Sequence, residues 1–286
     1  LMPFTDALVK ASEILIRHDA AEQERAQEAG LLDKKLLVSP GLAMAEAGAA
    51  LSKMGRLALE NLRMSIKQLS SYEPSVSAVI SDREDRLDNF ADRSDHFLIS
   101  LAHLLVTDEH SAHMNLLMQA VPDFERIGDY ATNIDELAQR LNNSKVCLSE
   151  RARKELEILC EAVDEIVTIT VDAFTRDDNE AAMQVEPLEE VIDDMVVTLR
   201  DSHTERLRCG VCTVNAGLVF IEVLTYMERA ADQCSSIALL MLARDNEEIR
   251  GNHHAYLRNL HSQGNEFYCA ELERRREQYL SRLKCS

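Results

Sequence analysis

The sequence predicts an all-α protein, on the evidence of its composition, its apolar periodicity and an internal repeat. The chain has 286 residues, of which 46% are hydrophobic, with no Trp, 9 Gly and 5 Pro. This mixture favours helices and lacks the Gly and Pro that mark the many turns of an all-β chain. From Pro40 onward, apolar residues recur almost without interruption at the 3.6-residue period of amphipathic helices.

The first part of the chain predicts a flanking helix, a connector and then three long helices. Residues 1–17 form a short amphipathic stretch, and residues 18–38 are polar and are interpreted as a connector. Ser39 and Pro40 mark a helix start, because Ser is a favoured N-cap and Pro fits the first helical position. The three helices that follow are predicted over residues 40–71, 74–106 and 108–142.

A second start at Ser149 begins another set of three helices and a tail. These helices are predicted over residues 149–176, 178–208 and 212–244. Residues 245–264 contain His253, His254 and His261, but their spacing matches no common metal motif, so we expect a solvated linker. A charged terminal helix is predicted over 265–284. The predicted segments are therefore the flanking helix and connector (1–38), the first set of three helices (39–145), the second set (146–246), and the linker with the charged helix (247–286).

A Glu-x-x-x-Asp motif recurs in the second and third helix of each set of three. The four copies are Glu84–Asp88, Glu125–Asp129, Glu189–Asp193 and Glu228–Asp232. Their Glu residues are 41 apart in the first set and 39 apart in the second, and corresponding copies are 105 and 103 apart. Near-equal spacing of this kind indicates a duplicated unit. We therefore predict two tandem three-helix bundles, flanked by short N-terminal and C-terminal helices.

The acidic pairs gain significance from their position rather than from their number. About nine acid–acid pairs at this spacing are expected by chance in so acidic a chain. Residues four apart share a helix face, and three of the four pairs interrupt an apolar stripe, where an unpartnered charge is costly. Two explanations remain open. The acids pair with Lys or Arg of adjacent helices, or they bind a cation such as Mg, Mn or Fe, which oxygen ligands suit.

Composition and motifs exclude several other functions. A net charge of −19 argues against nucleic-acid binding, which depends on Lys and Arg clusters. The seven Cys have no disulfide-framework spacing, and Cys209–Cys212 is a lone CxxC without a second ligand pair. No apolar run reaches the roughly 18 residues that span a bilayer.

An enzymatic role is also not expected. Carboxylate-bridged di-iron sites place a His three residues after a Glu. The corresponding positions here hold Leu87, Gly128, Ile192 and Ala231. Phosphate-binding loops, dinucleotide-binding motifs and acyl-transfer motifs are also missing. A dimetal enzyme is therefore kept only as a less favoured alternative, and we predict a non-enzymatic protein.

Taken together, these motifs resemble those of the PhoU family over residues 39–245. ERIGDYATNI and ERAADQCSSIA are similar to the third-helix signature of that family, and EDRLD and EEVID to its second-helix motif. The resemblance implies an all-α, often oligomeric protein that binds iron or zinc through the eight acids of the four motifs, and manganese and magnesium come from the oxygen-ligand argument. The resemblance also implies a role in phosphate signalling and in restraining phosphate uptake.

The resemblance has departures at neighbouring positions. The family commonly has His after the motif Asp, where this chain has Tyr130 and Gln233. Asn133 matches the family pattern and Ser236, its counterpart, does not. The resemblance gives both as possible supporting residues of the metal sites, with weaker binding expected in the second repeat.

The opening of the chain resembles the junction that follows the membrane region of bacterial sodium/phosphate cotransporters. The resemblance implies a regulatory domain on the cytoplasmic face of the plasma membrane, attached to the transmembrane region of the same polypeptide. The start at Leu1 agrees with a domain cut from a longer protein. The alternative is a free-standing PhoU-like adaptor that docks on an ABC phosphate transporter and a sensor kinase.

Overall fold

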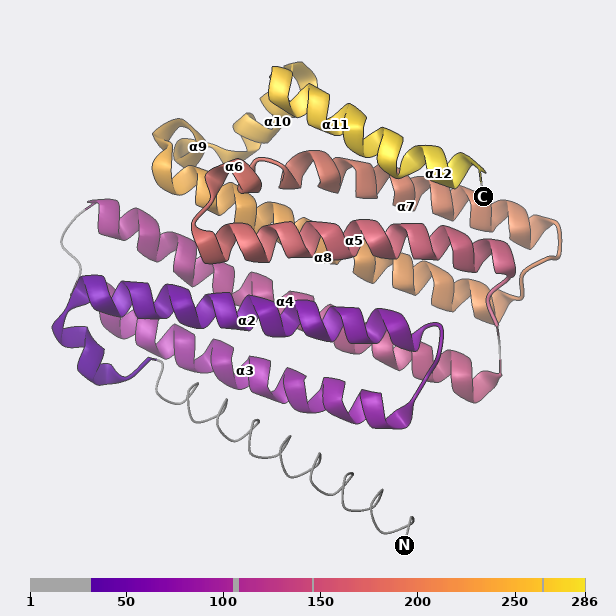
Figure 1. The fold of residues 1–286 in the computed structure, drawn as a ribbon, viewed down its shortest axis with the longest axis horizontal. Coiled ribbons are helices and arrows are strands. Elements are labelled where there is room, and N and C mark those ends of the chain that lie inside the picture. Colours follow the sequence, from indigo (N-terminus) through magenta and orange to yellow (C-terminus); the bar gives the residue numbers. More distant parts are fainter. Residues whose placement is uncertain (1–31, 105–107, 146, 264, 286) are drawn as a thin grey trace, which may run out of the picture.

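The computed structural model describes residues 32–104, 108–145, 147–263 and 265–285. The predicted helix over residues 1–17 lies outside them. The six predicted long helices are present as α2 (Pro40–Gln68), α3 (Pro74–Ala102), α4 (Asp108–Ser144), α5 (Glu150–Arg176), α7 (Val185–Arg208) and α8 (Val214–Asp245). They run side by side as an elongated bundle (Figure 1), so the predicted all-α class is confirmed. A short 3₁₀ turn, η1 (Lys34–Val38), precedes α2.

The helix starts at Ser39 and Ser149 lie where the capping signals predicted them, and α8 has a cap that was not predicted. The Ser149 hydroxyl accepts a hydrogen bond from the Ala152 backbone N–H at 3.2 Å and caps α5. Thr213 caps α8 in the same way, through the Ala216 N–H at 3.3 Å. At Ser39 the position of the cap is as predicted, although its side chain makes no capping hydrogen bond. These caps satisfy backbone donors that a helix leaves free in its first turn.

The helix predicted over 178–208 is wrong in one respect, because the structure divides it in two. A four-residue helix, α6 (Asn179–Ala182), ends before α7 begins at Val185. Pro187 gives the physical reason. A Pro ring collides with the carbonyl four residues earlier, here that of Met183, so a continuous helix through this point is disfavoured. In the first turn of α7 the same Pro is tolerated, since its missing N–H would have no helical partner there.

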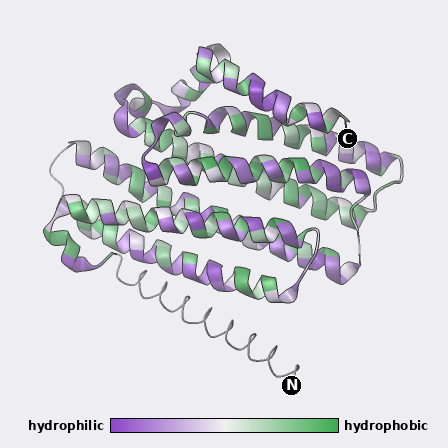
Figure 2. Ribbon diagram, in the orientation of Figure 1, coloured by the Kyte–Doolittle hydropathy of each residue, from purple (hydrophilic) through white to green (hydrophobic). Residues whose placement is uncertain are grey.

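The two repeats share one hydrophobic core. A single cluster of buried apolar side chains includes residues from all six long helices, and Figure 2 shows apolar and polar positions alternating along each of them. Aromatic pairs cross between the repeats. Phe124 of α4 meets Phe174 of α5 edge-to-face at 5.3 Å, and Tyr130 of α4 lies 6.0 Å from Tyr226 of α8. The third helices of the two repeats, α4 and α8, lie against each other.

The C-terminal part departs from the predicted linker. Residues 247–263 form α9 (Glu247–Gly251) and α10 (His253–Gln263), and they are followed by α11 (Glu266–Gln278) and α12 (Leu280–Cys285). Figure 1 shows α11 and α12, in yellow, passing along α7 at the edge of the second repeat, whereas α9 packs on α8. Leu283 and Tyr279 are buried in the shared core. The segment is helical because Asn246 and Asn265 cap α9 and α11.

Candidate metal centres

In the first repeat, α3 and α4 bring three of the predicted acids together. Glu84 and Asp88 lie one turn apart on α3, and Asp129 faces them from α4. One carboxylate oxygen from each lies within 4.8 Å of the other two. We call Glu84, Asp88 and Asp129 the first cluster. A spacing of this size allows one cation to contact all three residues.

The second repeat reproduces this arrangement with its own helices. Glu189 and Asp193 of α7 and Asp232 of α8 offer three oxygens that also lie within 4.8 Å of one another. We call these residues the second cluster. Each cluster thus takes both acids of a second-helix motif and the Asp of a third-helix motif, at corresponding places in the duplicated unit.

The remaining two predicted acids, Glu125 and Glu228, lie outside these groups of three. Glu125 is half-buried on α4. Its pKa is raised mainly by this burial and, to a smaller extent, by the negative charges of Asp129 and Asp88. Glu228 has a partner of another kind, because the Arg200 guanidinium donates to its carboxylate at 2.6 Å. Pairing with an Arg of an adjacent helix was one of the two explanations that the sequence left open for the motif acids. For Glu228 this explanation is correct.

The two predicted supporting residues make different contacts. The Asn133 side-chain amide donates to the Asp129 backbone carbonyl at 2.8 Å, so it lies one turn from the first cluster. Ser236 does not support the second cluster through a hydrogen bond, because its hydroxyl donates to Asp123 of α4 at 2.7 Å. It instead links α8 to α4 across the two repeats.

Burial and mutual repulsion raise the pKa of every acid in the two clusters. In the first cluster burial is the main cause for Glu84, Asp88 and Asp129, and the neighbouring carboxylates add to it. In the second cluster the pKa of Glu189 is raised to about 9, first by burial and then by the charges of Glu186 and Asp193. The pKa of Asp193 is raised to about 6, first by burial and then by the charge of Asp232. A carboxyl group in such surroundings holds a proton or needs a cation.

The second cluster fits a metal ion by two further observations. Asp193 Oδ1 is buried and has no hydrogen-bond partner among the described residues, which leaves a lone pair directed at nothing in the protein. Glu189 lies beside Asp232 and lowers the pKa of Asp232 by hydrogen bonding, and a cation would bind between the same two carboxyl groups. The donors are all carboxylate oxygens, which suit Mg, Mn and Fe and also serve as ligands of Zn.

The sequence missed three residues beside the second cluster. Glu186 and Glu190 of α7 flank Glu189, and His261 of α10 approaches both, with Nε2 2.7 Å from Glu186 and Nδ1 3.8 Å from Glu190. His261 was expected in a solvated linker. Its contact partners are 75 and 71 residues away along the chain, so no local pattern could have indicated them.

The CxxC pair lies at the turn between α7 and α8, and neither cysteine belongs to the two clusters. Cys209 is exposed and Cys212 is half-exposed, and both are free thiols. The Cys209 thiol donates to Glu205 at 3.3 Å, and this contact raises its pKa. A raised pKa makes a thiol less reactive.

Comparisons with known proteins agree with this geometry. The PhoU domain family matches residues 51–138 and 156–241, one match in each repeat. Three curated relatives are similar over about two thirds of the chain. A phosphate-specific transport system accessory protein PhoU homolog 1 from Thermotoga maritima is 24% identical over 65% of this chain and 80% of its own. Homologs from Clostridium acetobutylicum and Synechocystis are 21% and 26% identical, over 87% and 82% of their own lengths.

Solved structures have the same fold. The phosphate transport system regulatory protein PhoU from Streptococcus pneumoniae aligns with a TM-score of 0.67 at 17% identity, covering 74% of this chain and 99% of its own. PhoU from Pseudomonas aeruginosa aligns with a TM-score of 0.66 at 20% identity, covering 73% and 97%. Within the described residues, every helix is too short or too polar to cross a bilayer.

These comparisons settle the family. The relatives are accessory and regulatory proteins by name, in agreement with the prediction of a non-enzymatic chain. They also favour the free-standing adaptor over the cotransporter domain, because they are PhoU accessory proteins rather than parts of transporters. With a family match in each of the two repeats, the chain belongs to the PhoU family and carries two PhoU domains.

Proposed function

We propose that this protein is a metal-binding regulator of phosphate transport that acts as a separate adaptor on a phosphate transporter. The observation that carries the metal assignment is the pair of matching clusters, each with three carboxylate oxygens within 4.8 Å. A chance acidic patch has no reason to recur at the same place in both halves of a duplicated fold. The names of the relatives support the adaptor role in the phosphate-specific transport system.

The residues proposed to hold metal are the eight acids of the four motifs. The six acids of the two clusters are the principal ligands, and Glu125 and Glu228, one turn before Asp129 and Asp232 on the same helices, would add to them. A bound divalent cation would neutralise the mutual repulsion that now raises the pKa of these carboxyl groups. Such a cation would therefore fix α3 against α4 and α7 against α8. It would also stabilise the helix faces that bind the phosphate transporter.

Metal analysis of variants tests the assignment. Glu84→Gln/Asp88→Asn removes two ligands of the first cluster, and Glu189→Gln/Asp193→Asn removes two of the second. We expect each variant to lose the metal of its own cluster and to keep that of the other, by elemental analysis of the purified full chain. Glu136→Gln, an exposed acid on α4, is the matched control. Equal metal content in all four proteins would reject the assignment.

A second candidate rests on the N-terminal segment. The pattern of residues 1–38 supports a domain of a sodium/phosphate cotransporter, attached to a transmembrane region and assembled as a homo-oligomer at the inner face of the plasma membrane. The coding sequence upstream of Leu1 decides between the two. Apolar helices in the same reading frame would establish the cotransporter domain, and a start codon close to Leu1 would establish the separate adaptor.

A further inference from the structure

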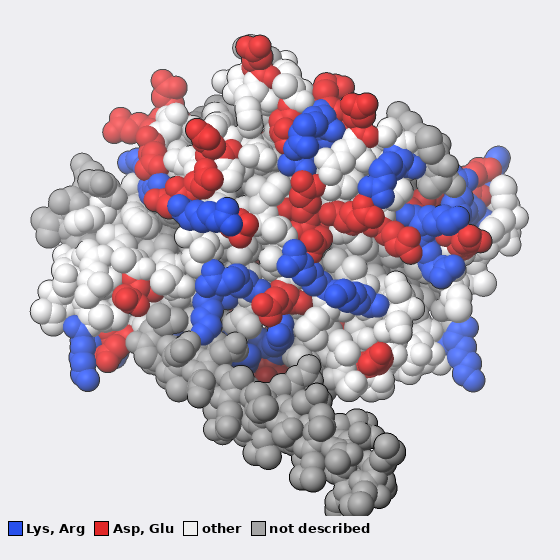
Figure 3. Space-filling view, viewed as in Figure 1, with Lys and Arg blue, Asp and Glu red and all other residues white. Residues whose placement is uncertain are grey.

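The C-terminal arm, residues 247–285 (α9 to α12), lies beyond the second family match, which ends at residue 241. It is nevertheless packed on the second repeat. Helix α11 lies along α7, and α12 contacts both α7 and α5. Figure 3 shows acidic and basic side chains interleaved over this part of the surface. The arm is therefore an addition to the shared fold that covers one edge of it.

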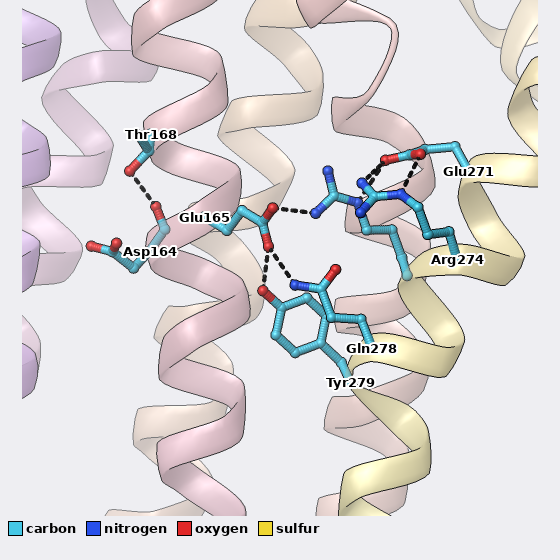
Figure 4. Close-up of polar contacts among 8 residues, drawn as sticks. Asp164, Glu165, Thr168, Glu271, Arg274, Gln278 and Tyr279 are labelled. Carbon is cyan, nitrogen blue, oxygen red and sulfur yellow. Dashed lines mark hydrogen bonds and ion pairs between the residues drawn. The ribbon is translucent and has the colours of Figure 1, made fainter.

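One end of the arm is held at Glu165 of α5. Its carboxylate accepts hydrogen bonds from the Arg275 guanidinium, from the Tyr279 hydroxyl and from the Gln278 amide, the last at 3.1 Å (Figure 4). Arg275 is only 1% exposed, and its second partner is Glu271 of the same helix at 2.7 Å. A buried cation held in this way loses its main partner if the arm leaves. The arm is therefore bound to the bundle by specific contacts.

The arm also contacts the acidic face of α7 beside the second cluster. Arg276 lies 3.3 Å from Asp194, and His261 is hydrogen-bonded to Glu186 at 2.7 Å. Both acids lie within one turn of Glu189 or Asp193. The Tyr268 side chain is buried, and its pKa is raised by burial and then by the charges of Glu190, Glu186 and Glu189. The arm thus lies within electrostatic reach of the second cluster.

The first repeat has different residues at the contact positions. Glu189 corresponds to Glu84, at the 105-residue spacing of the repeat, so Glu186 and Asp194 correspond to Ser81 and Asn89. Glu186 and Asp194, the partners of His261 Nε2 and Arg276, thus have uncharged counterparts in the first repeat, whereas Glu190 corresponds to the acidic Asp85. The first cluster is therefore an internal reference, with the same ligand types and without the acid that pairs with Arg276.

We propose that the C-terminal arm is a cover whose docking opposes metal binding at the second cluster. Arg276 brings positive charge to the face of α7 that a divalent cation would also neutralise. Docking of Arg276 therefore weakens the attraction of this face for the cation, and a bound cation weakens its attraction for Arg276. By thermodynamic linkage the two effects are equal in size. Metal at the second cluster then loosens α10 to α12 and exposes the edge formed by α5 and α7. This inference rests on the proposed metal binding.

Hydrogen exchange of the full chain with and without Mn²⁺ tests one direction of this coupling. We expect Mn²⁺ to speed exchange of the α11 amides by about fivefold or more, the lower end of common coupling strengths. The increase should persist in Glu84→Gln/Asp88→Asn and disappear in Glu189→Gln/Asp193→Asn. Exchange that is unchanged or slower while Mn²⁺ binds at the second cluster would overturn the proposal.

Calorimetric titration with Mn²⁺ tests the reciprocal direction. Arg276→Gln weakens docking of the arm to α7, so we expect about fivefold or more tighter binding at the second cluster and unchanged binding at the first. Arg274→Gln is the matched control, because Arg274 pairs with Glu271 of its own helix. Equal affinities in the two variants would overturn the coupling and leave the metal sites intact. A wild-type chain that binds no Mn²⁺ would overturn the metal assignment, and the coupling with it.

Discussion

At the scale of single residues, the second repeat differs from the first in a cation that lies beside its motif acids. Arg200 donates to Glu228 at 2.6 Å, and the position 105 residues earlier holds Asp95. The first repeat therefore has an acid where the second has a guanidinium. Arg200 already satisfies one carboxylate that a metal would otherwise use, so the second cluster should hold fewer or weaker cations.

Replacing Arg200 should change metal binding in the second repeat. Arg200→Gln removes the positive charge beside Glu228, and we expect tighter Mn²⁺ binding there, by about fivefold or more, because roughly 1 kcal/mol of cation repulsion is relieved. Calorimetric titration measures this. Arg140→Gln is the control, since Arg140 of α4 pairs with Glu222, an acid of α8 that belongs to neither cluster, at 3.2 Å. Identical isotherms for the two variants would contradict the role assigned to Arg200.

The raised pKa of Glu189 predicts how stability depends on pH in the metal-free protein. Its pKa is about 9 in the folded state and 4.5 ordinarily, so folding takes up a proton between these values. Its contribution to stability is therefore complete below pH 4.5 and is lost as the pH rises toward 9. For one proton, the free energy of unfolding falls by roughly 1.4 kcal/mol per pH unit at most.

Glu189→Gln should remove this part of the pH dependence, because an amide is neutral throughout. Urea unfolding in the presence of a chelator at pH 5, 6.5 and 8 measures it. The variant should lose less stability than the wild type from pH 5 to pH 8, and Glu136→Gln should follow the wild type. Parallel profiles for Glu189→Gln and the wild type would show that this carboxyl group is ionised in the folded protein.

At the scale of helices, close packing of α2 on α4 depends on one glycine. A Cβ at Gly55 would lie 2.8 Å from Cε1 of the fully buried Phe124 ring, whereas one at Gly48 of the same helix would lie 4.0 Å from Leu117. The Phe124 ring is fully buried and packs edge-to-face on Phe174. The close approach of α2 to α4 therefore requires a residue without a side chain at position 55.

Alanine at these two glycines should have opposite effects. Gly55→Ala overpacks the core and should lower the free energy of unfolding by about 1–3 kcal/mol. Gly48→Ala meets no clash and should raise it by roughly 0.5–1 kcal/mol, because Ala is the better helix former. Chemical denaturation of both variants checks the pair. A stabilising effect at Gly55 would mean that Phe124 can shift without loss.

Local chemistry explains which elements could be predicted from the sequence. Ser149 caps its helix as expected because capping depends on residues within one turn. The break before Pro187 was missed, although the clash of a Pro with the carbonyl four residues earlier is also local. Within a helix, the i,i+4 rule correctly placed Glu84 beside Asp88 and Glu189 beside Asp193.

Contacts between helices could not be predicted in the same way. The groups of three contain Asp129 and Asp232 rather than Glu125 and Glu228, and that choice depends on how each helix is rotated against its neighbour. Arg275 lies in a segment with a thin apolar stripe, and its burial depends on Glu165, 110 residues earlier. Such partners are fixed by packing and not by spacing along the chain.

At the scale of the whole molecule, the two repeats are separate in sequence and joined in packing. One buried cluster contains residues of both. Polar contacts also cross between them, including Arg63 Nη2 to Asp164 at 3.0 Å and Ser236 to Asp123 at 2.7 Å. A repeat cut at the predicted boundary near residue 145 would expose the apolar face that α4 now buries against α8, which is costly in water.

This shared core predicts that the two repeats unfold together. Small cooperative units give coincident transitions by different probes, so hydrogen exchange during denaturation should report one midpoint for α2 and α5. The fragment 39–145 should fail to give a cooperative transition when expressed alone, because its α4 face lacks α8. The matched control is the fragment 32–285, which keeps both repeats and should give one cooperative transition. A separately stable 39–145 fragment, with its own cooperative transition, would show that duplication left two independent domains, and the ion pair of Arg63 with Asp164 would then be a surface contact between them.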